Sequence, residues 1–100
     1  MIPQLNTLKL KIQLQYDIKT VRENVRLQTK KLLDENSFSD MFNPEDEAIY
    51  CIVEAKGMVI DKMVEELSIA YDFELEDLYE SHVYKQLVDY LFESFVAGDV

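Results

Sequence analysis

His82 is the only histidine of the chain and the first residue to test for acid–base or nucleophilic chemistry. Ser81 directly precedes it, but adjacent residues on a helix point in different directions and do not form a nucleophile–base pair. The sequence also contains no glycine-framed nucleophile turn and no glycine-rich phosphate-binding motif. These observations favour a protein without catalytic residues, and we expect no enzyme activity.

The acidic stretch 72–77 is the nearest approach to a metal-binding motif, because its acids alternate like the first ligands of an EF-hand loop. Such a loop requires glycine at its sixth position and a bidentate glutamate at its twelfth, where this chain has Asp77 and Val83. Cys51 is the only cysteine, so neither an internal disulfide nor a Cys-based zinc site can form. We therefore expect no metal and no cofactor, and we interpret Cys51 as a small buried apolar residue.

Length and composition predict one helical domain that spans residues 1–100. The chain is 48% hydrophobic, which supports a folded core, and it contains only two glycines and two prolines. So few turn-forming residues favour long helices over a sandwich or barrel. No run of 18 apolar residues and no signal-peptide pattern is present, so we expect a cytoplasmic protein that does not enter a membrane.

The formal net charge of −10 is unevenly distributed. Residues 1–35 carry seven Lys or Arg against four acids, a net of +3, whereas residues 36–100 carry three Lys against sixteen acids, a net of −13. An acidic surface repels phosphates, so we expect no direct nucleic-acid binding and favour a basic protein surface as the partner. The alternative is that the acidity serves only solubility. We expect the basic face of the first element to neutralise neighbouring acidic helices; it comprises Lys19, Arg22, Arg26 and Lys30.

The helix with the clearest predicted start covers residues 44–71. Asn43 is a suitable N-cap, Pro44 fits the first helical position, and three acids follow at the positive end of the helix dipole. Apolar residues then recur at helical spacing as far as Tyr71. Gly57 lies in the middle, where it marks either a close contact or bend, or a tolerated glycine.

The first element is predicted as a helix over about residues 5–34, with an ambiguous start. Residues 7–16 alternate apolar and polar, as a strand does, but no second alternating run in the chain offers a partner strand. A strand here would have to pair with another chain. The competing helical stripe consists of Leu10, Leu14, Ile18, Val21, Val25 and Leu32.

The third element is predicted as a helix over about residues 74–96, with Asp72 as a candidate cap. Its apolar surface is wider than a small bundle needs, which indicates an exposed docking surface, a thicker core or a homodimer seam. The aromatic residues concerned are Tyr79, Tyr84, Tyr90, Phe92 and Phe95. The predicted fold class is therefore all-α, with three long helices in a small bundle or an open array.

The segment 57–71, GMVIDKMVEELSIAY, resembles part of the late-transcription coactivator of T-even-type phages. The matching positions are Gly57, Val59, Ile60, Asp61, Lys62, Met63, Val64, Glu65, Glu66, Leu67 and Tyr71, with a weaker echo at Tyr79, Val83, Leu87, Val88 and Asp89. The resemblance covers about a quarter of the chain. It implies a small acidic helical protein that binds the flap of the host RNA polymerase β subunit. It also implies a bridge to the phage sliding clamp through the C-terminal tail, although this chain departs from the family in ending Ala97-Gly98-Asp99-Val100.

We therefore expect a non-enzymatic, phage-type adaptor that binds bacterial RNA polymerase in the host cytoplasm and modulates transcription. The expected partner-binding residues are Met58, Ile60, Met63, Leu67, Tyr71, Tyr84, Phe92 and Phe95. One alternative is an acidic inhibitor that occludes the nucleic-acid-binding groove of a nuclease or defence effector. The other is a helical homo-oligomer with a structural role, a homodimer being its simplest form.

Overall fold

The computed structural model describes residues 2–35 and 44–98, and all regular secondary structure in these ranges is helical. The elements are α1 (Leu5–Gln15), α2 (Ile18–Glu35), α3 (Pro44–Tyr71), α4 (Leu75–Glu80), α5 (His82–Leu91) and the short π-helix η1 (Phe92–Val96). The all-α prediction is confirmed. Within the described ranges no strand occurs, and residues 7–15 belong to α1.

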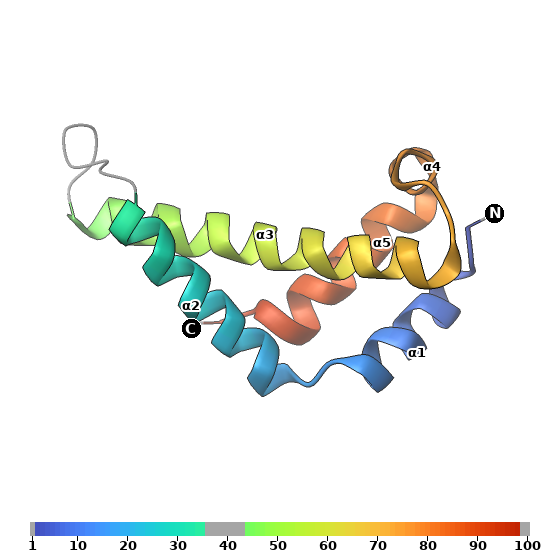
Figure 1. Cartoon of the computed structure of the whole chain (residues 1–100), viewed down its shortest axis with the longest axis horizontal. Coiled ribbons are helices and arrows are strands. Elements are labelled where there is room, and N and C mark those ends of the chain that lie inside the picture. Colours follow the sequence, from blue (N-terminus) through green and yellow to red (C-terminus); the bar gives the residue numbers. More distant parts are fainter. Residues whose placement is uncertain (1, 36–43, 99–100) are drawn as a thin grey trace.

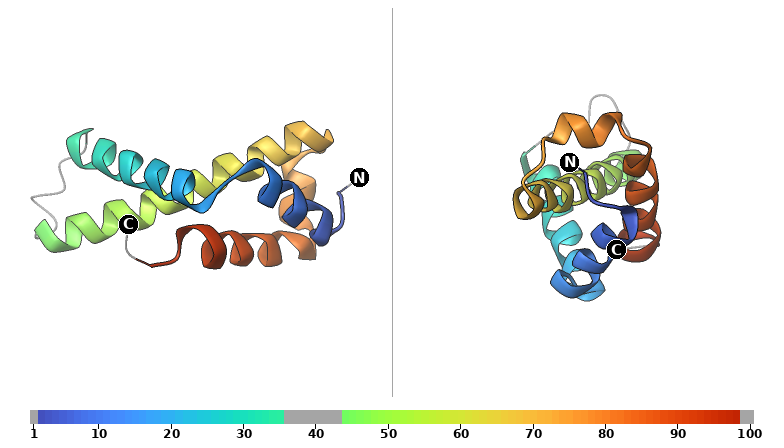
Figure 2. Two further views of the ribbon diagram at one scale, coloured as in Figure 1. Left: turned by 90° about the horizontal axis from the view of Figure 1, so that it is seen from below. Right: turned by 90° about the vertical axis from the view of Figure 1, so that its right-hand side faces the viewer.

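Helix α3 runs along most of the molecule, which is 46 Å long (Figure 1). Helix α2 packs against its first half and middle, while α1, α4 and α5 gather around its C-terminal end (Figure 2). The predicted bounds 44–71 are confirmed, with Pro44 first and three acids in the first turn. The predicted cap, Asn43, lies outside the described residues.

The first element is two helices rather than the single helix predicted over residues 5–34. Tyr16 has extended backbone angles, φ −125° and ψ 145°, and ends α1. Asp17 then caps α2, because its carboxylate accepts the Thr20 backbone N–H at 3.0 Å and the Thr20 hydroxyl at 2.6 Å. The break changes which residues are buried: Leu8 and Ile12 face the core, whereas Leu10 and Leu14 of the predicted stripe face solvent.

The Asp17 cap makes the stability of α2 dependent on pH. Its hydrogen bonds with Thr20 lower the pKa of the Asp17 carboxyl below its ordinary value. A lowered folded-state pKa gives stability that is present above about pH 4 and is lost as the pH falls through the folded-state value. We expect Asp17→Ala to lower the midpoint of thermal unfolding by a few degrees at pH 7, and the difference from the unmodified chain to shrink at pH 3.

Asp34→Ala is the matched control, because Asp34 lies in the last turn of the same helix, where a negative charge opposes the dipole. It should leave the midpoint unchanged or raise it slightly. A difference for Asp17→Ala that is equally large at pH 7 and pH 3 would contradict the assignment.

The predicted helix over residues 74–96 is also divided. Ser81 is extended, with φ −87° and ψ 153°, and separates α4 from α5. Asp72, predicted to cap this element, instead ends α3 in the left-handed conformation, with φ 53°. The Phe73 N–H donates to the Ser68 carbonyl at 3.1 Å across this turn, which satisfies one of the free carbonyls at the helix end.

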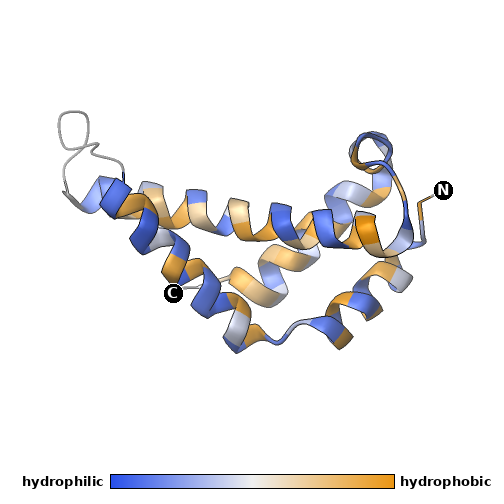
Figure 3. Ribbon diagram, viewed as in Figure 1, coloured by the Kyte–Doolittle hydropathy of each residue, from blue (hydrophilic) through white to orange (hydrophobic). Residues whose placement is uncertain are grey.

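The hydrophobic core is built from residues of all the helices, with α3 contributing the most, and apolar ribbon segments face it (Figure 3). Helix α1 packs on α5 through the fully buried Leu8 and Ile12. Two polar contacts support this packing: Gln13 Nε2 donates to the Tyr90 hydroxyl at 3.1 Å, and Lys9 Nζ lies 5.0 Å from the Tyr90 ring centroid. The N-terminal helix is thereby fixed to the C-terminal part of the chain.

Two cationic side chains link the backbone just after η1 to helices α2 and α3. Arg22 of α2 donates through Nη2 to the Ala97 carbonyl at 2.9 Å, and Lys56 of α3 donates to the Gly98 carbonyl at 2.8 Å. Positive charge at a helix C-terminus is favourable, because the free carbonyls there are the negative end of the dipole. These bonds position η1 against the middle of α3.

Gly57 is a tolerated glycine within the continuous helix α3, which answers the question left open by the sequence. A Cβ added at this position would meet no heavy atom within 4 Å. We therefore expect Gly57→Ala to raise the free energy of unfolding by about 0.5–1 kcal/mol, since alanine favours helix and restricts the unfolded chain. Chemical denaturation measures the change; Gly98→Ala is the contrasting variant, expected to bring no gain because Gly98 has φ +87°. A destabilised Gly57→Ala chain would show that the helix needs glycine there.

Candidate protein-binding surface

The predicted partner-binding residues divide into three groups by exposure. Buried are Ile60, Met63, Leu67 and Phe95; half-buried are Tyr71 and Tyr84; exposed are Met58 and Phe92. The expectation that the whole set faces a partner therefore needs correction for the four buried residues. They lie on the side of α3, or on η1, that other helices of the same chain cover, so little of their surface is open to a partner in this conformation.

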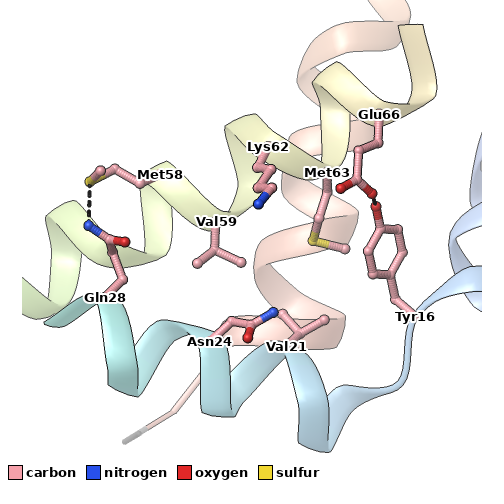
Figure 4. A pocket seen from close by; sticks show the side chains of 9 residues that line it. All are labelled: Tyr16, Val21, Asn24, Gln28, Met58, Val59, Lys62, Met63 and Glu66. Carbon is pink, nitrogen blue, oxygen red and sulfur yellow. Dashed lines mark hydrogen bonds between the residues drawn. The ribbon is translucent and has the colours of Figure 1, made fainter. Parts of the chain in front are cut away.

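A groove lies between α2 and α3 (Figure 4). Its volume is about 370 Å³, and α3 contributes most of its wall. Lining residues are Tyr16, Val21, Asn24, Gln28, Met58, Val59, Lys62, Met63 and Glu66. The groove brings together Met58 and Met63 from the predicted set and places them on an apolar floor with a polar rim.

Polar contacts across the helices shape this groove. The Tyr16 hydroxyl donates to a carboxylate oxygen of Glu66, and Gln15 Nε2 approaches the same oxygen at 3.3 Å. At the other end, Gln28 Nε2 donates to the Met58 sulfur at 3.6 Å (Figure 4). The Glu66 carboxylate thus joins the α1–α2 junction to α3, and Met58 remains at the rim as a flexible, polarisable contact residue.

Sequence reasoning missed Tyr16, Asn24 and Gln28 as groove residues. Asn24 and Gln28 are four residues apart and therefore share a face of α2 beside the buried Val21 and Val25. Two amides bordering an apolar stripe are a detectable signal. Tyr16 gave no such signal, because its position depends on the break between α1 and α2.

The aromatic residues of the C-terminal part form two pairs and not one continuous exposed surface. Tyr79 and Tyr84 pack edge to face with ring centroids 4.9 Å apart, and Tyr90 and Phe95 do so at 6.1 Å. Burial raises the pKa of the Tyr84 hydroxyl above its ordinary value, and the nearby Asp61 and Tyr79 raise it further. Tyr79 and Phe92 are exposed, whereas Tyr90 and Tyr84 are half-buried.

Cys51 is a buried residue on the α3 helix, in agreement with its interpretation as a small apolar side chain. Burial raises the pKa of its thiol, and the charges of Glu47 and Glu54 add to that effect. A raised pKa keeps the thiol protonated at neutral pH, and a protonated, buried thiol is a poor nucleophile.

Residues 2–35 and 44–98 contain no group of three or more His, Cys, Asp or Glu side chains arranged to hold a metal ion. The helices within these ranges also include none whose length and apolar character would suit a membrane crossing.

Comparisons with protein-family models, with curated proteins and with solved structures find no match for this chain.

Proposed function

We propose that this chain is a non-enzymatic adaptor that binds another protein, and that the partner is bacterial RNA polymerase. The observation that carries the proposal is the α2–α3 groove, where an apolar floor, a polar rim and the exposed Met58 meet on an acidic molecule. Concave apolar surfaces with a few placed polar groups are typical binding sites, and Met and aromatic residues contribute strongly to protein interfaces.

The choice of RNA polymerase depends on the resemblance of residues 57–71 to the phage coactivator family. This same segment supplies one wall of the groove, through Met58, Val59, Lys62, Met63 and Glu66. In this proposal the buried residues of the segment keep α3 in place, and Met58, Lys62 and Glu66 at the rim contact the polymerase. Phe92 adds a second exposed contact.

Co-elution with purified bacterial RNA polymerase tests the proposal. The chain and the polymerase are mixed at micromolar concentration and separated on a sizing column, and we expect them to elute together. Met58→Asp should weaken the association about tenfold, because it replaces an exposed apolar contact at the rim of the groove with a charge. Leu27→Asp is the matched control: Leu27 is also exposed but does not line the groove. Separate elution of the unmodified chain and the polymerase would reject this function.

A second candidate function, an acidic inhibitor of a nucleic-acid-binding protein, is favoured by the charge of the C-terminal elements. Residues 72–96 carry seven acids and one lysine. Association driven by these carboxylates should weaken steeply between 50 and 500 mM salt, whereas association through the apolar groove should change little. The salt dependence of any complex therefore separates the two functions.

A further inference from the structure

Two exposed aliphatic strips lie on two different helices, α1 and α3. The α1 strip consists of Leu10 and Leu14, which are 56% and 78% exposed. The α3 strip consists of Ile49 and Val53, which are 60% and 62% exposed. In both strips the two residues are four apart, so they share one face of their helix.

The two strips have opposite electrostatic surroundings. Helix α1 carries Lys9 and Lys11 and no acid. The first eleven residues of α3, 44–54, carry four acids and no base. Apolar strips with flanking charges of opposite sign are complementary surfaces, because their contact buries aliphatic area and brings unlike charges together.

A single chain cannot bring its two strips together. The α1–α2 junction contacts α3 at Glu66, through Gln15 and Tyr16. Glu66 lies 13 residues beyond Val53 on the same helix, a distance of about 20 Å at 1.5 Å per residue. The α1 strip therefore lies beside the C-terminal end of α3, whereas the α3 strip lies near the N-terminal end of that helix. Figure 1 shows that α1 and the first half of α3 are at different ends of the molecule.

The α3 strip is the uncovered continuation of a face that is buried further along the helix. Ile60 and Leu67 lie 11 and 18 residues after Ile49, close to whole numbers of helical turns, and both are in the core. Helix η1 ends at Val96, and the Gly98 carbonyl after it accepts a hydrogen bond from Lys56 of α3. The residues that cover this face of α3 therefore end near Lys56, and Ile49 and Val53 stay exposed. Another helix placed on the strip would extend the same packing.

We propose that α1 of a second copy of this chain covers the α3 strip, so that copies associate head to tail. Lys11, next to Leu10, in one copy meets the acidic first half of α3 in the other, and Leu10 and Leu14 pack on Ile49 and Val53. Because the two contacting surfaces differ, each copy keeps one strip free, and the association extends beyond a dimer unless it closes into a ring. Strips of this size give a weak contact, and 0.15 M salt screens the repulsion between distant charges of two acidic copies.

Sedimentation velocity from 10 µM to 1 mM in 0.15 M salt tests this association. The weight-average mass is expected to rise with concentration from the monomer value of 11.8 kDa. Leu14→Glu and Val53→Lys should each remove the rise, and Leu14→Ser and Val53→Ser should weaken it without a new charge. Circular dichroism verifies that these variants fold, which their exposed positions favour.

Mixing the variants distinguishes the head-to-tail contact from a symmetric one. An equimolar mixture of Leu14→Glu and Val53→Lys retains one intact α1 strip and one intact α3 strip, so it should form a 1:1 dimer although neither variant associates alone. A constant monomer mass for the unmodified chain at 1 mM, a mass unaffected by Leu14→Glu, or no dimer in the mixture would each overturn the proposal. None of these results depends on RNA polymerase, so the association is tested separately from the proposed function.

Discussion

Met63→Asp is expected to unfold this chain, whereas Met58→Asp, five residues earlier on the same helix, is expected to leave it folded. Met63 is 3% exposed and belongs to the core cluster, while Met58 is 42% exposed at the rim of the groove. An unpaired carboxylate in the core has no compensating partner, so it either stays charged at high cost or takes up a proton. We expect a loss above about 4 kcal/mol, which is comparable with the whole stability of a small domain.

Far-ultraviolet circular dichroism with urea denaturation measures both variants. Met63→Asp should show little helix at 25 °C and pH 7, and Met58→Asp should have an unfolding midpoint close to that of the unmodified chain. Met63→Leu, which keeps apolar volume, is the control for position and should cost less than about 1.5 kcal/mol. A folded Met63→Asp chain would mean that this side chain is accessible to solvent and to partners.

Leu8→Ala is expected to lower the free energy of unfolding by about 2–5 kcal/mol, and Leu10→Ala by less than about 0.5 kcal/mol. Leu8 is a fully buried residue of α1 in the contact with α5. Its truncation leaves a cavity in the contact that holds α1 in place. Leu10 lies on the opposite, solvent-facing side of the same helix. The pair therefore compares the same substitution on the two faces of α1.

Urea denaturation gives both values, and protection of α1 amides from hydrogen exchange shows whether the helix detaches. In Leu8→Ala we expect α1 amides to exchange faster than those of α3. Equal losses for the two variants would indicate that α1 has no fixed buried face, as in a helix that rotates or frays. A larger loss for Leu10→Ala would indicate that the buried face of the helix is the stripe that contains Leu10, Leu14 and Ile18.

The long helix α3 could be predicted to the residue because local signals agree with its tertiary role. Pro44, the three acids after it and the apolar repeat all depend on neighbours within a few turns. The breaks at Tyr16 and Ser81 could not be found this way. Asp17 can cap a helix, but the helical spacing of apolar residues continues on both sides of it and predicts one uninterrupted helix. Ser81 is likewise a single serine within a continuous apolar pattern.

The candidate site was predicted less completely than the fold. Periodicity identified the apolar face of α3 but not which of its residues neighbouring helices would cover. Met58 and Met63 differ in exposure because the helices packed against α3 cover Met63 and leave Met58 open to solvent. That information depends on where α5 and η1 lie, which depends in turn on the turn at Asp72 and the break at Ser81. Tyr16 was likewise not predicted as a groove residue, because only the extended backbone between α1 and α2 brings its hydroxyl to Glu66.

The packing of α1 on α5 has a consequence for synthesis on the ribosome. The hydrogen bond between Gln13 and Tyr90 joins residues 77 positions apart, and the neighbouring Leu8 and Ile12 need the same late segment as cover. At 5–20 residues per second, translation leaves these side chains without their native neighbours for about 4–15 s after they are made. Residues 5–15 thus remain an uncovered, apolar and lysine-bearing segment until residues 82–96 have been made and can pack on them.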